Sequence, residues 1–192
     1  MVVEPLPEHG LILVSGPSRG GKSAWAEHLA QQYTGGPVLY LATGPGIGSD
    51  PSWSERVARH QDRRPDAWQA LEVGAELIEQ LRALVGDGDP PPLLLIDSLG
   101  TWLAWYLDET QEQWGQRCDQ LIHALVSQRG PVVLVLEETG WGVVPATAVG
   151  GLFRDRLGAL QQVLMQHCHT AWLVVAGRAI NLIEHSLPVP PA

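Results

Sequence analysis

Short apolar runs alternate with amphipathic stretches along the 192 residues of this chain. The apolar runs are continuous, as is typical of strands that are covered on both faces of a parallel sheet. The stretches between them have the spacing of helices that pack on such a sheet. The expected strands are Leu11–Ser15, Val38–Ala42, Leu93–Asp97, Val132–Glu137 and Trp172–Ala176, and the expected helices are Lys22–Tyr33, Ser54–Arg64, Gly74–Val85, Leu99–Leu107, Glu112–Gln128 and Gly151–Cys168. This order predicts an α/β fold with a mostly parallel sheet whose strand C-termini meet at one edge, where ligands collect in such sheets.

The chain has the length of one ordinary domain. No long polar insertion divides it, and a hydrophobic content of 45% is enough for a substantial core. We therefore expect a single domain over residues 1–192, with loose ends at about 1–9 and 186–192.

Composition excludes several classes of partner. A formal net charge of −9 argues against a nucleic-acid backbone as the main ligand. Two cysteines, Cys118 and Cys168, do not form a disulfide framework and fit the reducing cytoplasm. No apolar run approaches the length of a membrane span, and Met1–Gly10 lacks the basic start of a signal peptide.

The most informative segment is Gly16-Pro17-Ser18-Arg19-Gly20-Gly21-Lys22-Ser23, which fits the phosphate-loop pattern G-x-x-x-x-G-K-[ST]. It lies between an apolar run and a helical pattern, which is the context that this pattern requires. Glycines let backbone N–H groups surround phosphate oxygens, and the following helix adds the positive end of its dipole. Lys22 is expected to reach the β- and γ-phosphates and the Ser23 hydroxyl to bind Mg²⁺. The sequence therefore predicts a site for a nucleoside triphosphate with Mg²⁺.

A second, acidic ligand for the cation is expected at Asp97. This residue ends the apolar run Leu93–Asp97, and a carboxylate in that position helps hold the Mg²⁺ of P-loop proteins. Asp97 also precedes a helical pattern, so it is a candidate helix N-cap. Both roles are compatible with the sequence.

His60 lies in a basic segment. Arg56, Arg63 and Arg64 are offset from it by four, three and four residues, so a continuous helix would bring them to one face. Neighbouring cations lower the pKa of an imidazole and attract a triphosphate. Such a histidine could attack an α-phosphate and carry the nucleotidyl group covalently. On spacing alone, an incidental histidine on a solvated helix face is the simpler interpretation.

Further blocks follow in a recognisable order. These are Tyr40–Thr43, Arg59–Pro65 with Trp68 and Glu72, Thr101–Leu103 after Asp97, Glu138–Pro145, Phe153–Gly158 and Trp172–Gly177. Together with the phosphate loop they resemble the bifunctional adenosylcobinamide kinase / adenosylcobinamide-phosphate guanylyltransferase family of cobalamin biosynthesis. The resemblance extends from about Leu11 to Gly177, nearly the whole chain.

The resemblance implies two reactions at a RecA-like P-loop sheet. The first phosphorylates the aminopropanol hydroxyl of adenosylcobinamide with ATP or GTP. The second transfers GMP from GTP to that phosphate through a guanylylated histidine, which corresponds to His60. The implied nucleotide-binding positions are Gly16, Pro17, Ser18, Arg19, Gly20, Gly21, Lys22, Ser23, Ala42, Thr43, Gly44, Gln61, Asp62, Arg63, Arg64, Glu72 and Asp97, with Mg²⁺ on Ser23 and Asp97. It also implies a homo-oligomer, specifically a trimer.

The chain departs from the family pattern at two positions near the phosphates. Gly20 replaces a common serine, and Glu137 replaces a common asparagine, adding a negative charge. Trp141 lies in a glycine-rich loop and is a candidate contact for the corrinoid. Arg154 and Arg156 are interpreted either as phosphate contacts or as solvated helix positions.

Two other functions are compatible with the phosphate loop. A kinase without the transferase would phosphorylate its substrate and form no covalent guanylate. A nucleotide-dependent switch would be expected to carry the N-K-x-D base-reading motif of GTPases, which this sequence lacks.

Overall fold

A computed structural model of the chain describes residues 6–46, 54–55, 58, 64–86, 88–143 and 145–190. Seven strands form one sheet in the order β3-β2-β4-β5-β1-β6-β7. All neighbouring strands are parallel except β7, which runs antiparallel to β6. The strands are β1 (Gly10–Gly16), β2 (Val38–Ala42), β3 (Gln69–Glu72), β4 (Leu93–Asp97), β5 (Pro131–Glu137), β6 (Cys168–Val175) and β7 (Arg178–Asn181).

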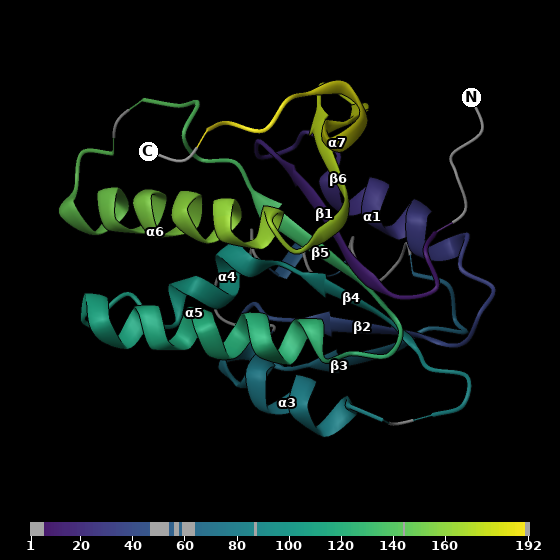
Figure 1. Cartoon of the computed structure of the whole chain (residues 1–192). Coiled ribbons are helices and arrows are strands. Elements are labelled where there is room, and N and C mark those ends of the chain that lie inside the picture. Colours follow the sequence, from purple (N-terminus) through teal and green to yellow (C-terminus); the bar gives the residue numbers. More distant parts are fainter. Residues whose placement is uncertain are drawn as a thin grey trace.

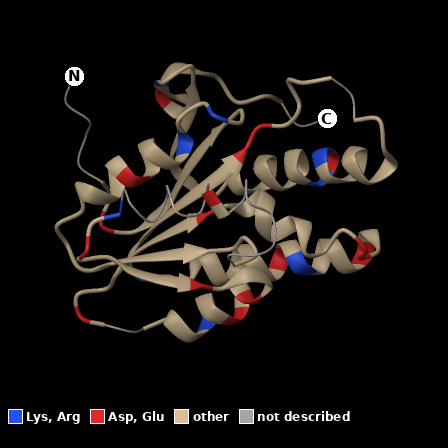
Figure 2. Cartoon of the chain, turned by 180° about the vertical axis from the view of Figure 1, so that it is seen from behind, with Lys and Arg blue, Asp and Glu red and all other residues tan. Residues whose placement is uncertain are grey.

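Helices cover both faces of the sheet (Figure 1). Helix α1 packs on one face, and in the view from behind it lies in front of the strands (Figure 2). Helices α3, α4, α5 and α6 contribute to the apolar core on the opposite face. The helices are α1 (Lys22–Gln31), the 3-10 turn η1 (Gly74–Glu76), α3 (Leu77–Leu84), α4 (Leu99–Ala104), α5 (Gln111–Val126), α6 (Ala148–Met165) and α7 (Leu182–His185).

Polar side chains define where several helices begin. Ser98 and Thr110 accept hydrogen bonds from the backbone N–H groups three residues ahead and form capping boxes at α4 and α5. Thr147 caps α6 and Asn181 caps α7 in the same manner. The Ser98 cap fixes the start of α4 directly after β4, the strand that ends in Asp97.

The parallel α/β fold predicted from the sequence is confirmed. Strands β2 and β4 have the predicted bounds, whereas β6 begins at Cys168 rather than Trp172. The helix expected over Gly151–Cys168 runs over Ala148–Met165, three residues earlier at both ends. The edge strands β3 and β7 were not predicted. The helix expected over Ser54–Arg64 falls mostly outside the described residues; Ser54, Glu55 and Ala58 are helical and Arg64 is in a bend.

Lys and Arg occupy scattered positions on the ribbon (Figure 2), and both cysteines are free thiols. Among the helices that the structure describes, none has the length and apolar character needed to cross a bilayer.

Candidate nucleotide site

The phosphate loop connects β1 to α1 at the C-terminal edge of the sheet. Strand β1 is central, between β5 and β6, and the six residues that follow Gly10 in it are buried. The loop closes on itself through a hydrogen bond from Gly20 N–H to the Pro17 carbonyl, at 3.1 Å. Arg19 has a positive φ of 59°, and Gly21, the residue before α1, has a φ of 106°. This backbone makes the sharp turn from strand to helix that a phosphate cradle requires.

Two glycines of the loop lie where β6 approaches closely. A Cβ atom on Gly16 would lie 2.1 Å from the Val174 carbonyl oxygen, and one on Gly20 would lie 2.7 Å from the same oxygen. Gly177 N–H also donates to the Gly20 carbonyl at 3.1 Å. The glycine that replaces the common serine at position 20 therefore fits tightly between the loop and β6.

Lys22 and Ser23 are at the start of α1. The Lys22 side chain is buried, and its Nζ donates to the Pro17 carbonyl of the loop at 3.0 Å. The ammonium thus lies against the loop that would surround the phosphates. Ser23 is half-buried in the first turn, next to the positive end of the helix dipole.

Asp97 ends β4, with β5 between its strand and β1. It is not the cap of α4, because Ser98 has that role. Instead, its Oδ2 accepts a hydrogen bond of 2.9 Å from the Tyr40 hydroxyl. The guanidinium carbon of Arg64 lies 3.6 Å from the centroid of the same tyrosine ring. Burial, followed by the charge of Asp97, raises the pKa of Tyr40, so this phenol remains a proton donor.

A second polar cluster holds the ends of β2, β4 and β5 together. The buried Thr43 hydroxyl lies 2.6 Å from the Ser98 carbonyl and 2.6 Å from the Thr101 hydroxyl. Glu137 accepts a hydrogen bond from the Ser98 hydroxyl and another, at 3.0 Å, from Gly100 N–H. The negative charge that replaces the common asparagine is therefore directed at the N-terminus of α4, where backbone donors stabilise it.

The donor set fits Mg²⁺. No cluster of three or more His, Cys, Asp or Glu side chains suited to a metal occurs in the described part of the chain. Asp97 and the Ser23 hydroxyl supply one carboxylate and one neutral oxygen at the same edge of the sheet. Mg²⁺ characteristically takes one or two carboxylates and completes its shell with phosphate oxygens and water.

The structure brings most of the other predicted residues to this edge. Ala42, Thr43 and Gly44 lie at the end of β2, and Glu72 lies at the end of β3, where it pairs in register with Ala42. Pro17, Ser18 and Arg19 lie in the phosphate loop. His60, Gln61, Asp62 and Arg63 are outside the described residues.

Some residues have roles that differ from the prediction. Tyr40 was named within the block Tyr40–Thr43 but not predicted as a site residue, although a tyrosine two positions before the end of a buried strand faces the same side as that strand end. Arg156, interpreted as a phosphate contact or a solvated position, is neither: it is 4% exposed and donates to backbone carbonyls after α4. Arg154 is paired with the adjacent Asp155. The helix expected to reach Cys168 ends at Met165, and His167 lies in the turn before β6.

The sheet order, the phosphate loop and the acidic strand end define a P-loop nucleotide-binding protein. Solved structures support this fold. The chain superimposes with a TM-score of 0.57 on a Pyrococcus horikoshii OT3 protein known from a structural study, at 7% identity over 96% of this chain and 90% of the other. The score for a second solved structure, described as an ATPase domain, is 0.53, at 13% identity over 88% and 70% of the two chains.

Sequence comparison identifies the family. Residues 12–182 match the family described as cobinamide kinase / cobinamide phosphate guanyltransferase. The chain is 35% identical to the bifunctional adenosylcobalamin biosynthesis protein CobP of Pseudomonas aeruginosa, over 88% of this chain and 95% of that protein. It is 32% identical to the bifunctional protein CobU of Escherichia coli, over 90% and 99% of the two. The chain belongs to the cobinamide kinase / cobinamide phosphate guanyltransferase family, and it is an enzyme of cobalamin biosynthesis with these two activities.

Proposed function

We propose that this enzyme phosphorylates adenosylcobinamide with ATP or GTP and then transfers GMP from GTP to the new phosphate through His60. The products are adenosylcobinamide-GDP and pyrophosphate. The observation that supports this most is the arrangement at one sheet edge: a phosphate loop with a buried lysine, and an aspartate linked through Tyr40 to the arginine that ends the histidine segment.

In the kinase step the substrate hydroxyl oxygen attacks the γ-phosphorus, the hydroxyl proton leaves, and the nucleoside diphosphate departs. Lys22 and the loop N–H groups neutralise charge on the transferred group, which is the main requirement of phosphoryl transfer. When bound through Ser23 and Asp97, Mg²⁺ supplies further charge neutralisation. The hydrogen bond from the Tyr40 hydroxyl to Oδ2 orients the Asp97 carboxylate for this role.

In the guanylyl step an imidazole nitrogen of His60 attacks the α-phosphorus of GTP and pyrophosphate leaves. The phosphate of the acceptor then attacks the same phosphorus and releases the histidine. Arg63 and Arg64 stabilise the departing pyrophosphate. For Arg64 this is supported by a buried Nε that has no hydrogen-bond partner among the described residues.

The remaining nucleotide contacts are proposed at Ala42–Gly44, Gln61, Asp62 and Glu72. For the corrinoid we propose the loop after β5. The backbone N–H of Glu138 donates to the Gly16 carbonyl, so this loop starts at the phosphate cradle. Trp141 is 60% exposed within it, which leaves its indole available to the apolar rim of a macrocycle.

We also propose a cytoplasmic location, which is supported by the two free cysteines. A homo-oligomer, specifically a trimer, is proposed from the family resemblance. Nucleic acid is not proposed as a partner, since the net charge is −9.

Labelling with GTP tests the histidine directly. Incubation with α-labelled GTP should leave acid-labile label on the protein, and His60→Ala should abolish it. His123→Ala, on α5 and away from the phosphate loop, is the matched control and should label normally. Label that persists on the His60→Ala variant would overturn the assignment. Phosphorylation of adenosylcobinamide without any covalent guanylate in the wild type would favour the kinase-only alternative.

A further inference from the structure

Tyr40 joins two parts of the site that come from distant segments. It lies on β2, opposite Leu95 of β4, and its side chain is buried. Its hydroxyl reaches diagonally to Asp97, two residues further along β4, at 2.9 Å. The hydrogen bond occupies one oxygen of the carboxylate and restricts its rotation, so the other oxygen keeps a defined direction.

The second contact of Tyr40 is made by its ring, which faces Arg64. The Arg64 guanidinium carbon lies 3.6 Å from its centroid, which is a close cation–π contact. The Nε of Arg64 is buried and has no hydrogen-bond partner among the described residues. The aromatic face supports this cation, and Arg64 also interacts electrostatically with the Tyr40 hydroxyl.

The two contacts strengthen each other. A phenol that donates to a carboxylate becomes richer in electrons, and an electron-rich ring attracts a cation more strongly. The hydroxyl of Tyr40 contacts Asp97 at 2.9 Å while its ring faces Arg64 at 3.6 Å. The carboxylate, the phenol and the guanidinium therefore form one continuous chain across β2 and β4.

We propose that Tyr40 is a positioning residue that fixes Asp97 toward the cation and Arg64 toward the nucleotide phosphates, and so couples the two halves of the site. The inference rests on the proposed function, because it takes Asp97 as a Mg²⁺ ligand and Arg64 as a phosphate contact. Tyr40 touches neither ligand itself; it acts through these two side chains.

The two arms of the proposal can be separated by two substitutions. Tyr40→Phe removes the hydrogen bond to Asp97 and keeps the ring under Arg64. Tyr40→Leu removes both contacts. Tyr33→Phe is the matched control, because the Tyr33 hydroxyl donates to the Pro91 carbonyl, away from the strand ends that carry Asp97. The readout is the binding of a fluorescent, non-hydrolysable GTP analogue, titrated with Mg²⁺ and then measured at saturating Mg²⁺.

Tyr40→Phe should raise the half-saturating Mg²⁺ concentration about tenfold, as expected for loss of a hydrogen bond to a charged group. Tyr33→Phe should leave this value within about twofold, although both variants lose one tyrosine hydrogen bond. In an Asp97→Asn background, Tyr40→Phe should add nothing further. At saturating Mg²⁺, Tyr40→Phe should bind the analogue normally, and Tyr40→Leu should bind it about tenfold more weakly because Arg64 has lost its support.

An unchanged Mg²⁺ dependence in Tyr40→Phe would overturn the proposal, and so would a full additional effect in the Asp97→Asn background. Equal affinities of Tyr40→Phe and Tyr40→Leu at saturating Mg²⁺ would overturn the Arg64 arm. If the wild type transfers neither phosphate nor guanylate but the Tyr40 variants show these binding shifts, the proposed function is wrong and the coupling is correct. If it does not bind the analogue with Mg²⁺, both are wrong.

Discussion

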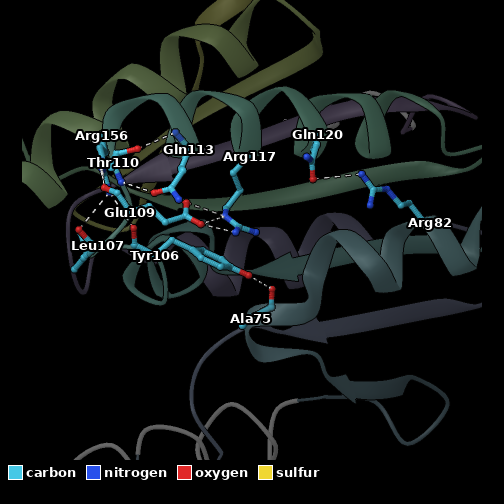
Figure 3. A network of polar contacts seen from close by, with 10 residues as sticks. All are labelled: Ala75, Arg82, Tyr106, Leu107, Glu109, Thr110, Gln113, Arg117, Gln120 and Arg156. Atoms are coloured by element: carbon cyan, nitrogen blue, oxygen red, sulfur yellow. Dashed lines mark hydrogen bonds and ion pairs between the residues drawn. The ribbon is translucent and has the colours of Figure 1, made fainter.

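Replacement of Arg156 by methionine should destabilise the fold without affecting nucleotide binding. Arg156 lies on α6 and is buried against the turn that follows α4 (Figure 3). Its Nη1 donates to the Tyr106 carbonyl at 2.9 Å and its Nη2 donates to the Glu109 carbonyl. A third contact, to the Leu107 carbonyl, is long at 3.5 Å. Methionine has a similar length and no donor, so Arg156→Met leaves these carbonyls without their partners.

The expected cost follows from these contacts. A hydrogen bond from a charged donor contributes about 1.5 kcal/mol at the low end of its range, so two good bonds contribute about 3 kcal/mol. The ring of Trp114, 5.4 Å from the guanidinium carbon, adds about 0.5 kcal/mol. The buried Nε without a partner among the described residues argues for the low end. A loss of about 3.5 kcal/mol corresponds to a fall in Tm of about 7–14 °C for a chain of this size.

Chemical denaturation followed by tryptophan fluorescence measures the free energy of unfolding. Arg154→Met is the matched control, because Arg154 pairs only with the adjacent Asp155 in the contacts that the structure describes. An exposed pair of this kind contributes at most about 1 kcal/mol. Binding of a GTP analogue to folded Arg156→Met should equal that of the wild type. The reasoning is refuted if Arg156→Met and Arg154→Met unfold alike, or if Arg156→Met folds stably and loses nucleotide affinity.

Three further outcomes are expected. Gly16→Ala should prevent nucleotide binding in equilibrium dialysis, because its methyl group would lie 2.1 Å from the Val174 carbonyl oxygen. Glu137→Gln should keep the cap of α4 and unfold within about 0.5 kcal/mol of the wild type, whereas Glu137→Ala should lose about 2 kcal/mol in urea titrations. Burial raises the pKa of the Cys118 and Cys168 thiols from the ordinary 9.0 to about 11 and about 12. The free energy of unfolding that these protonated thiols contribute is therefore complete below pH 9.0 and declines as the pH rises from there toward about 12. Alkylation should be slow in the native protein at neutral pH and fast in urea.

The elements that were predicted correctly are those whose pattern lies in consecutive residues. The phosphate loop and the buried strands β2 and β4 were located from consecutive residues, because two-sided burial demands unbroken apolar runs. The edge strands were missed, since β3 and β7 include exposed polar residues and have neighbours on one side only. The first residues of β6 were missed because Cys168–Thr170 is mixed in polarity, and its pairing with β1 shifts in register there.

Roles that depend on distant partners were not predictable. Tyr40 and Asp97 are 57 positions apart, and Arg156 and Tyr106 are 50 apart. Nothing in the local sequence around Arg156 distinguishes a buried arginine from a solvated one, because the carbonyls that bind it belong to another helix connection. For Tyr40 the face that it shares with Asp97 was the available signal, and it becomes specific only when the strand order is known.

The contact of the phosphate loop with β6 has a consequence for truncated forms of the protein. Every residue assigned to the nucleotide lies before Ser98. The backbone that packs against Gly16 and Gly20, however, belongs to Val174 and Gly177. A fragment that stopped after α6 would retain the whole phosphate-loop motif but lack β6, the strand that packs against the loop. Genome surveys that count the motif alone would score such a remnant as intact, although its affinity for triphosphate would be gone.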